Sequence, residues 1–441
     1  MNLRHVVSCS LVCAALALTA CDKGRQDPGN VTVRVANAAP GFAELGFRRE
    51  QRGNVDTLSF KGAQEYSFNV DTYDFFVFER ALLDTQTPRT WTFSAQLQTA
   101  REYTFVLTEV GGEVRGVVLD APTAPAADAQ IIALHAAAGL PAMDLYLERP
   151  GVGIAGATPR GTFNVQEQIP ARTLPSGDYE LWLTAAGNRA NVLLTSTTIS
   201  LTAGTTSTFV VAEGAGQTVG QLSVMLLQPS PSLLFDRNAT TQLRVVNGAT
   251  DTVPRDFAIG SQFSPPLFSG VPFAEATAYA TIATGAQTIN VTPVGNPGVL
   301  ELNQTLTGFA GERTTLLFAG PAGTLTHVVA LDDGRRIHNE AKILFMNAAV
   351  QFTNIDFVVV DPGLDPTGVF AFATLPAPGT TPSYGNLAPG EYDLYLRRSD
   401  TLALLSGAIR ISLAGDGVYG ALAINGPDTA TATVAFFDDF P

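Results

Sequence analysis

Residues 389–396 of the chain read Pro-Gly-Glu-Tyr-Asp-Leu-Tyr-Leu. The Pro-Gly pair is a turn signal that favours a type II turn with φ > 0 at Gly390. The residues after it alternate between the two faces of a β-strand. Tyr392 and Leu394 fall on one face, whereas Asp393 and Tyr395 fall on the other. The stretch therefore predicts a tight turn followed by a half-buried strand.

The same pattern occurs at three earlier places in the chain, at residues 176–183 and, more loosely, at 70–77 and 284–289. Each unit also opens with an alternating segment that closes on a polar residue and a small one. These polar residues recur at intervals of about 100 residues, at Asn37, His135, Asn247 and Asn347. In three units an Asp follows nine positions later, at Asp144, Asp256 and Asp356. The sequence therefore predicts four copies of one β unit.

About seven short strands per copy, joined by tight turns, predict an all-β protein of tandem antiparallel β-sandwich (immunoglobulin-like) domains. We expect each copy to have its own core, and a pairwise assembly of neighbouring copies is the alternative. The Ala-rich segments 126–138 and 273–283 favour helix by composition, but their place in the repeat predicts strand, with a helical turn or two allowed in the second. The predicted segments are 1–20 (lipoprotein signal peptide), 21–30 (tether), 31–121, 128–228, 240–333 and 340–441 (repeats 1 to 4) and 229–239 (linker).

The amino terminus has the pattern of an export signal. A basic start at Arg4 precedes an apolar run over residues 6–18, and Leu18-Thr19-Ala20-Cys21 matches the bacterial lipoprotein cleavage box. An ordinary secretory signal, with Cys21 incidental, is the alternative. We expect Cys21 to become the acylated first residue and to attach the chain to a membrane. The predicted location is the bacterial cell envelope, facing the periplasm or the cell surface.

Composition excludes several classes of function. The chain has 441 residues, of which 46% are hydrophobic and 15% charged, as expected for a folded protein. Its formal charge is −14 and it has no basic run, so nucleic acid is not an expected partner. Of the three cysteines, Cys9, Cys13 and Cys21, only Cys21 follows the predicted cleavage site. A disulfide within the mature chain, a catalytic cysteine and a cysteine zinc site are therefore not expected.

The recurring motifs resemble a known family. The Asn-Ala opening, the Asp nine residues on, the Pro-Gly-Glu-Tyr-Asp-Leu segment and the Ala-Gly turn before a later tyrosine are similar to bacterial envelope modules classed as domain of unknown function 4397. The resemblance covers nearly the whole mature chain and is clearest in repeats 2 and 4. It implies a secreted or surface-anchored β module, and it carries over no catalytic residues.

No motif in the sequence predicts catalysis. The chain lacks a Gly-x-Ser-x-Gly elbow, a phosphate-binding loop and paired metal-binding histidines, so we expect no enzyme activity and no cofactor. The recurring Asn residues, and His135 in the same position, are interpreted as turn residues that bond their own backbone. Three pairs of acidic residues fit either calcium ligands or solvated strand ends: Asp332 with Asp333, Asp438 with Asp439, and Asp361 with Asp365.

Aromatic residues on the central strands offer possible contacts. Tyr179 and Tyr392 share the phase of core leucines, whereas Trp182 and Tyr395 fall on the opposite phase and are the candidate exposed aromatic contacts. We therefore predict a lipid-anchored envelope protein with a non-catalytic binding or spacer role and an envelope protein or glycan as possible partner. A calcium- or glycan-dependent adhesin is the first alternative, and an envelope hydrolase is the alternative from another class.

Overall fold

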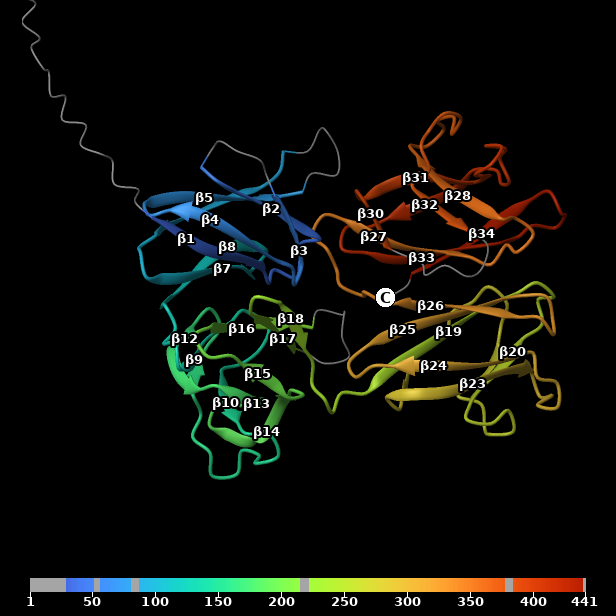
Figure 1. Ribbon diagram of the computed structural model, residues 1–441. Coiled ribbons are helices and arrows are strands. Elements are labelled where there is room, and N and C mark those ends of the chain that lie inside the picture. The colour runs from blue at the N-terminus through green and yellow to red at the C-terminus, as the bar shows by residue number, and fades with distance from the viewer. Residues whose placement is uncertain (1–28, 51–55, 81–86, 215–221, 377–383, 439–441) are drawn as a thin grey trace, which may run out of the picture.

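The computed structural model describes residues 29–50, 56–80, 87–214, 222–376 and 384–438. The predicted signal peptide, Cys21 and residues 22–28 of the tether lie outside the described residues. Within the described residues every regular element is a β-strand and there is no helix. The strands form four two-layered sandwiches that follow one another along the chain (Figure 1). The predicted fold class, all-β with tandem β-sandwiches, is confirmed.

Sandwiches 1 and 2 make up the first half of the chain. Sandwich 1 pairs the sheet β4-β1-β7-β8 with the sheet β3-β2-β5-β6. Its strands are β1 (Asn30–Asn37), β2 (Glu44–Arg49), β3 (Asp56–Ser59), β4 (Ala63–Asn69), β5 (Thr72–Glu79), β6 (Thr90–Gln96), β7 (Arg101–Val110) and β8 (Glu113–Pro122). Sandwich 2 pairs β12-β9-β16-β17-β18 with β11-β10-β13-β14, and β15 joins β13. Its strands are β9 (Asp128–His135), β10 (Met143–Glu148), β11 (Gly161–Phe163), β12 (Gln168–Pro175), β13 (Gly177–Ala185), β14 (Asn188–Thr195), β15 (Ile199–Leu201), β16 (Thr206–Glu213), β17 (Leu222–Leu227) and β18 (Ser232–Leu234).

Sandwiches 3 and 4 follow with the topology of sandwich 1. Sandwich 3 pairs β22-β19-β25-β26 with β21-β20-β23-β24. Its strands are β19 (Thr241–Ala249), β20 (Arg255–Ile259), β21 (Phe268–Val271), β22 (Ala280–Ile282), β23 (Gly285–Pro293), β24 (Leu302–Gly308), β25 (Arg313–Gly320) and β26 (Thr326–Leu331). Sandwich 4 pairs β30-β27-β33-β34 with β29-β28-β31-β32. Its strands are β27 (Ala341–Asn347), β28 (Asn354–Val360), β29 (Ala373–Pro376), β30 (Tyr384–Leu387), β31 (Gly390–Arg398), β32 (Ile409–Leu413), β33 (Val418–Asn425) and β34 (Ala432–Asp438).

We call the sheet that holds the first strand of each sandwich its inner sheet, and the other its outer sheet. In every inner sheet the first strand runs parallel to a late strand, in the pairs β1/β7, β9/β16, β19/β25 and β27/β33. The sequence prediction of purely antiparallel sheets did not include this pair. Parallel neighbours need a long crossover between them, and the intervening strands, including the whole outer sheet, supply it.

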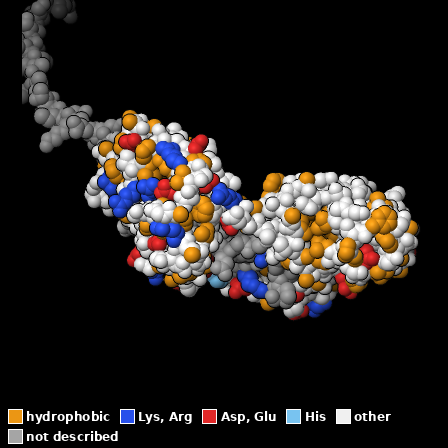
Figure 2. Space-filling model, turned by 90° about the horizontal axis from the view of Figure 1, so that it is seen from below, with side chains coloured by type: hydrophobic (Ala, Val, Ile, Leu, Met, Phe, Trp, Pro, Cys, Tyr) orange, Lys and Arg blue, Asp and Glu red, His pale blue; other side chains and the backbone are white. Residues whose placement is uncertain are grey.

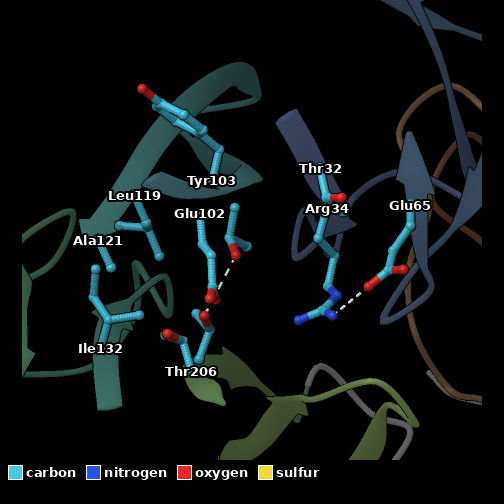
Figure 3. A pocket seen from close by; sticks show the side chains of 11 residues that line it. Thr32, Arg34, Glu65, Glu102, Tyr103, Leu119, Ala121, Ile132 and Thr206 are labelled. Atoms are coloured by element: carbon cyan, nitrogen blue, oxygen red, sulfur yellow. Dashed lines mark hydrogen bonds and ion pairs between the residues drawn. The ribbon is translucent and has the colours of Figure 1, made fainter. Parts of the chain in front are cut away.

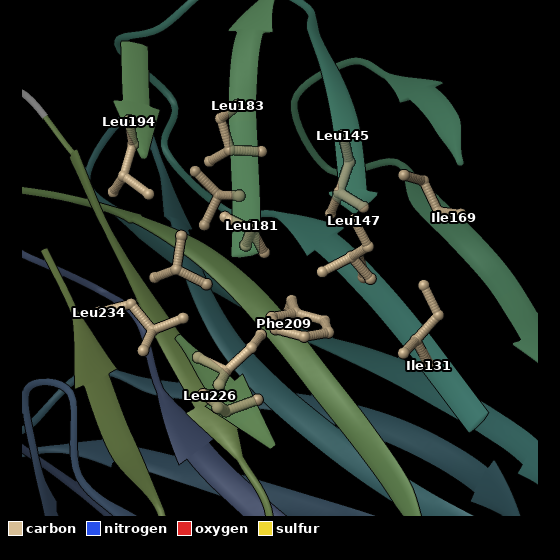
Figure 4. Packing of buried hydrophobic residues seen from close by; sticks show 14 of the residues in the cluster. Ile131, Leu145, Leu147, Ile169, Leu181, Leu183, Leu194, Phe209, Leu226 and Leu234 are labelled. Carbon is tan, nitrogen blue, oxygen red and sulfur yellow. The ribbon is translucent and has the colours of Figure 1, made fainter. Parts of the chain in front are cut away.

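Each sandwich has its own hydrophobic core between its two sheets. In sandwich 2 the core includes Leu145, Leu181, Leu183 and Phe209, which point toward one another from both sheets (Figure 4). Equivalent clusters fill sandwiches 1, 3 and 4. Burial of these side chains, at roughly 25 cal/mol per Å² of apolar surface, stabilises each sandwich without any disulfide.

A second set of apolar residues joins the sandwiches in pairs. The inner sheets of sandwiches 1 and 2 face each other through residues such as Val106, Ile132 and Val210. Those of sandwiches 3 and 4 face each other through residues such as Leu344 and Leu422. The pairwise alternative left open by the sequence is therefore the observed arrangement. The central strands of each inner sheet, such as β16 and β27, are therefore buried on both faces, and no sandwich depends on its own core alone.

Two segments differ from the sequence predictions. The predicted linker 229–239 contains β18, which pairs with β17, and Leu234 enters the core of sandwich 2. The segment 273–283 contains no helical turn, so that allowance was wrong. Phe273 and Ala276 form isolated β-bridges with Asn247 and Val246 of β19, and the segment then continues into β22. In both segments contact with a neighbouring sheet outweighs the local composition.

The turn before β31 also differs from the expectation. Gly390 has φ of 158°, close to extended backbone and far from the value of about +80° that a type II turn requires. Gly390 instead begins β31 and pairs with Leu413. A side chain at Gly390 would meet only Tyr392, at ordinary contact distance, but residues with a side chain rarely adopt this φ. The Pro-Gly pair therefore starts a strand and does not form the predicted turn type.

A cavity in the pairing interface should destabilise two sandwiches together. Leu344 is fully buried between sandwiches 3 and 4, so we expect Leu344→Ala to lower the free energy of unfolding by about 2–5 kcal/mol. Hydrogen exchange should show lost amide protection in both sandwiches 3 and 4. The exposed Leu364 is the control, and its change to Ala should stay within about 0.5 kcal/mol. Loss of protection confined to sandwich 4 would mean that the pairing contributes no stability.

Candidate binding surfaces

The recurring asparagines close the ends of the sandwiches. Asn37 Oδ1 accepts a hydrogen bond from Ala39 N at 2.9 Å, and Asn247 and Asn347 do the same two residues on. The predicted turn role is therefore confirmed. The side-chain amide of each also donates to a carbonyl in or beside the outer sheet, on Leu58, Val271 and Leu375 respectively. Because each side chain is buried and bonded at both ends, these residues hold the two sheets together.

His135 fills the same position in sandwich 2. Its Nδ1 accepts from Ala137 N at 3.3 Å, and its Nε2 lies 3.0 Å from the carbonyl oxygen of Pro141. Burial lowers the pKa of His135. A neutral imidazole offers one acceptor and one donor, as an amide does, so His135 replaces the asparagine without a change of role.

The recurring aspartates are also bonded within the fold. Asp256 accepts hydrogen bonds from the backbone N–H groups of Gly270 and Gly295, at 2.8 and 2.9 Å. Burial alone would raise the pKa of Asp256, but these hydrogen bonds outweigh burial and lower it. Asp356 pairs with Arg397 at 3.0 Å, and Asp144 accepts from Gly187 N at 2.8 Å. These carboxylates connect loops to the outer sheets.

The candidate aromatic contacts do not share a surface. Trp182 lies on β13 of sandwich 2 and Tyr395 on β31 of sandwich 4, and both are half-buried. The guanidinium of Arg237 lies 5.3 Å from the ring centre of Trp182. Tyr179 is buried and donates to the carbonyl of Pro175, and Tyr392 donates to that of Ala388 in the same way.

The acidic pairs have separate environments. Asp332 is buried and accepts hydrogen bonds from Tyr279 and Thr315, both at 2.6 Å. Burial alone would raise the pKa of Asp333, but the charges of Lys342 and Arg335 outweigh burial and lower it. Burial raises the pKa of Glu340, which ends the connector between sandwiches 3 and 4. Among the described residues no three His, Cys, Asp or Glu side chains gather to hold a metal ion. Asp439 lies outside the described residues.

The connector between sandwiches 3 and 4, residues 333–340, docks on sandwich 1. His338 N donates to the carbonyl of Gly41 at 2.8 Å, and Arg335 Nη1 donates to that of Phe42 at 2.6 Å. The imidazole of His338 lies 2.6 Å from Glu109. Sequence reasoning missed this contact because its partners lie more than 200 positions apart. The one available signal was the density of charge in Asp-Asp-Gly-Arg-Arg-Ile-His-Asn-Glu (332–340), in a chain with few charges.

Exposed apolar side chains occupy equivalent loops of three outer sheets. Val152 lies between β10 and β11, Phe263 between β20 and β21, and Phe370 between β28 and β29, with exposures of 67%, 71% and 93%. The matching loop of sandwich 1 includes residues 51–55, which lie outside the described residues. Figure 2 shows Lys and Arg side chains on the lobe that carries sandwiches 1 and 2, and hydrophobic side chains along the other lobe.

Two hollows lie beside the pairing interfaces. A cavity of about 220 Å³ between sandwiches 1 and 2 is lined by residues that include Arg34, Glu65, Glu102 and Thr206. A wider groove of about 790 Å³ between sandwiches 3 and 4 is lined by the segment 274–279, the end of β34 and parts of the connector. Both hollows lie where inner sheets of neighbouring sandwiches meet.

Removal of one sheet-joining asparagine should cost stability. Asn347→Ala leaves buried carbonyls and the N–H of Ala349 without their partner, so we expect a loss of about 1–3 kcal/mol. Chemical denaturation measures the change. Asn354, exposed on β28, is the matched control, and Asn354→Ala should change stability by less than about 0.5 kcal/mol. Equal effects of the two changes would contradict a structural role for Asn347.

Docking of the connector should depend on pH through His338. The hydrogen bond to Glu109 raises the pKa of His338, so this contact stabilises docking fully below pH about 6.5 and is lost as pH rises through the raised pKa. Burial alone would raise the pKa of Glu109, but His338 and Gly41 outweigh burial and lower it, so the carboxylate weakens docking only when pH falls through that lower value. Arg89 and Asp416 also face His338, and the charge of Arg335 acts on Glu109. Lys61, whose pKa burial lowers to about 8, faces Arg335 of the same connector.

Hydrogen exchange corrected for intrinsic rates provides the measurement, for wild type and His338→Gln between pH 5.5 and 8.5. We expect protection of residues 337–340 to fall with rising pH in the wild type and to fall less steeply in the variant. His327, whose pKa burial lowers, is the control, and His327→Gln should keep the wild-type profile. Identical profiles for wild type and His338→Gln would show that His338 does not control docking.

Comparison with solved structures finds only distant likeness. The Bacillus anthracis TIE protein matches at 10% identity and a TM-score of 0.16, covering 90% of this chain and 68% of its own. The pilus adhesin SpaC from Lactobacillus rhamnosus GG matches at 9% identity and a TM-score of 0.14, covering 68% of this chain and 42% of its own. No curated protein matches the chain in sequence. The described residues include no helix long and apolar enough to span a membrane.

The family comparison agrees with part of the resemblance seen in the sequence. The matched stretch begins at the first residue of β19, covers sandwich 3 and ends within β28 of sandwich 4. Residues 241–358 are thus similar to the family described as Domain of unknown function (DUF4397).

Proposed function

We propose that this protein is a lipid-anchored component of the bacterial cell envelope that binds and spaces other envelope components without catalysis. The observation that carries the proposal is the recurrence of exposed apolar side chains, Val152, Phe263 and Phe370, in equivalent loops of three sandwiches. Single exposed apolar residues are ordinary, but repetition of such residues at one position of a repeated fold is typical of an interaction surface. The occupant we propose is an apolar surface of another envelope protein.

The buried polar residues support a structural use of the motifs. The asparagines and aspartates that recur between copies accept hydrogen bonds from backbone N–H groups of their own sandwich. A catalytic acid or base needs a free position facing a substrate. The recurring side chains therefore serve the fold, and the binding role falls to the loops that differ between copies.

The pairing and the docked connector support a spacer role. Sandwiches 1 and 2 share one apolar interface, sandwiches 3 and 4 share another, and residues 335–338 attach the second pair to sandwich 1. Loops on such a body keep fixed separations. Several weak contacts at fixed separations gain affinity through effective concentration.

The anchor is tested by Cys21→Ser. We expect the wild-type protein to partition into the detergent phase, because two or more lipid chains give stable membrane attachment. The variant, which lacks the cysteine that receives the lipid, should remain uncleaved or be processed differently. Mass spectrometry of the mature amino terminus and detergent partitioning are the measurements. Unchanged size and partitioning of the variant would reject the lipoprotein assignment.

The binding role is tested by a variant with Val152, Phe263 and Phe370 all changed to Ser. We expect sedimentation of the full-length protein with isolated envelope fragments to weaken at least tenfold, because each change removes apolar contact area. Phe309→Ser, which alters an exposed phenylalanine outside these loops, is the control and should bind as the wild type does. Unchanged binding of the triple variant would contradict the proposal. Enzymatic turnover of an ester, a glycoside or a peptide by the purified protein would also contradict it, if changing one carboxylate or histidine abolished that activity.

A further inference from the structure

The cavity between sandwiches 1 and 2 carries opposite charges on its two sides. Arg34 of β1 and Glu65 of β4 form an ion pair on one side (Figure 3). Glu102 of β7 lies on the other side, together with Leu119, Ala121, Ile132 and Thr206. No ion pair joins Arg34 to Glu102, and Glu102 has no hydrogen-bond partner among the described residues. The cavity thus holds the Arg34–Glu65 ion pair on one side and a second carboxylate, that of Glu102, on the other.

In sandwich 3 the same position holds a buried ion pair. Arg34 pairs in register with Thr104 between β1 and β7, and Arg244 pairs in the same way with Thr315 between β19 and β25. The Nε of Arg244 donates to Thr315 at 2.7 Å, and its guanidinium lies 3.6 Å from Asp332. The side chains of Arg244 and Asp332 are almost fully buried. Sandwich 3 therefore neutralises its arginine internally.

Three differences leave this position open between sandwiches 1 and 2. Ala121 stands opposite Glu102, and the residue at the equivalent place in sandwich 3 is Asp332, which stands opposite Arg313. Sandwich 1 therefore lacks the carboxylate that Asp332 provides. Thr104 turns to Thr208 of sandwich 2, at 3.3 Å, and leaves the arginine. The neighbouring sandwich differs as well. Tyr384 of sandwich 4 reaches Asp332 of sandwich 3, at 3.5 Å. In sandwich 2 the position of Tyr384 is taken by the irregular stretch of β12 between Ile169 and Arg172. As a result the buried Nε–H of Arg34 has no partner among the described residues.

A buried N–H without a partner costs about 1–3 kcal/mol, a cost that a ligand or a water molecule offsets when it accepts the bond. The side chain of Arg34 is only 14% exposed, so bulk water does not compensate this cost in full. A carboxylate supplied from outside would accept from the Nε–H of Arg34, in the place that Thr315 takes beside Arg244 in sandwich 3. The charge of Glu102 would repel a simple anion there, and it would attract an ammonium group.

We propose that this cavity binds a small zwitterion of the α-amino-acid class. The ligand's carboxylate accepts from the guanidinium of Arg34, and its ammonium group donates to Glu102. The apolar part of the ligand packs against Leu119 and Ile132. The cavity of about 220 Å³ has the volume of about seven water molecules, which suits an amino acid and is too small for a drug-sized ligand. This inference is independent of the proposed envelope role, which rests on the loops.

Calorimetry of the full-length protein in detergent tests the proposal, with glycine, alanine and leucine as probes. Acetate and methylammonium serve as half-ligands, and glucose serves as a neutral probe. We expect saturable binding of at least one amino acid. Acetate, methylammonium and glucose should each bind at least tenfold more weakly than that amino acid. Arg34→Gln and Glu102→Gln should each weaken amino-acid binding at least tenfold. Arg115, exposed on β8 of the same sheet, is the matched control, and Arg115→Gln should bind as the wild type does.

Ala121→Asp is the sharpest variant because it restores the carboxylate found in sandwich 3. We expect it to pair with Arg34, to abolish amino-acid binding and to raise the melting temperature. Circular dichroism and the melting curve establish that each variant is folded. Absence of saturable binding by any amino acid probe in the millimolar range would overturn the proposal. Equal binding of acetate and alanine, or binding retained by a folded Arg34→Gln variant, would also overturn it.

Discussion

Burial of the inner sheets on both faces is the constraint on which the rest of the structure depends. One face of each inner sheet packs on its own outer sheet, and the other packs on the inner sheet of the neighbouring sandwich. Strands such as β16 and β27 are consequently buried along almost their whole length. Separation of a pair would expose a continuous apolar face to water. The physical unit of this protein is therefore the pair of sandwiches.

Two-sided burial also determines where polar groups can lie. At the ends of the inner strands, Asn37, Asn247 and Asn347 satisfy buried backbone groups and connect the two sheets, and His135 replaces them once. Within the interfaces, buried charges need partners because the surroundings have a low dielectric constant. Sandwich 3 supplies Asp332 to Arg244, whereas sandwich 1 supplies Ala121 at the matching place. At this place the second pair has a buried ion pair, whereas the first pair has a cavity beside the Arg34–Glu65 ion pair.

In the proposed binding role, the surfaces that meet partners are the loops of the outer sheets. Residues 149–160, 260–267 and 361–372 connect equivalent strands, yet they share little sequence. Each exposes an apolar side chain at a position that the outer sheet determines. A scaffold of repeated sheets with variable loops suits a binding role, because the loops can change without loss of the core. The docked connector adds a fixed relation between the two pairs, through Arg335 and His338.

The sequence by itself determined the strands, the class of fold and the position of the turn-forming asparagines, because alternation and turn residues act over a few positions of the chain. The periodic leucines of 389–396 correctly placed Leu394 and Leu396 in a core. Tertiary structure alone decided the pairing of sandwiches, the incorporation of 229–239 into sandwich 2 and the docking of 333–340. Those outcomes rest on contacts between segments and surfaces that no local sequence pattern describes. The cavity beside Arg34 is of the same kind, since its charges come from β1, β4 and β7 and its far wall from sandwich 2. No local pattern contains that arrangement, and only the folded chain brings those residues together.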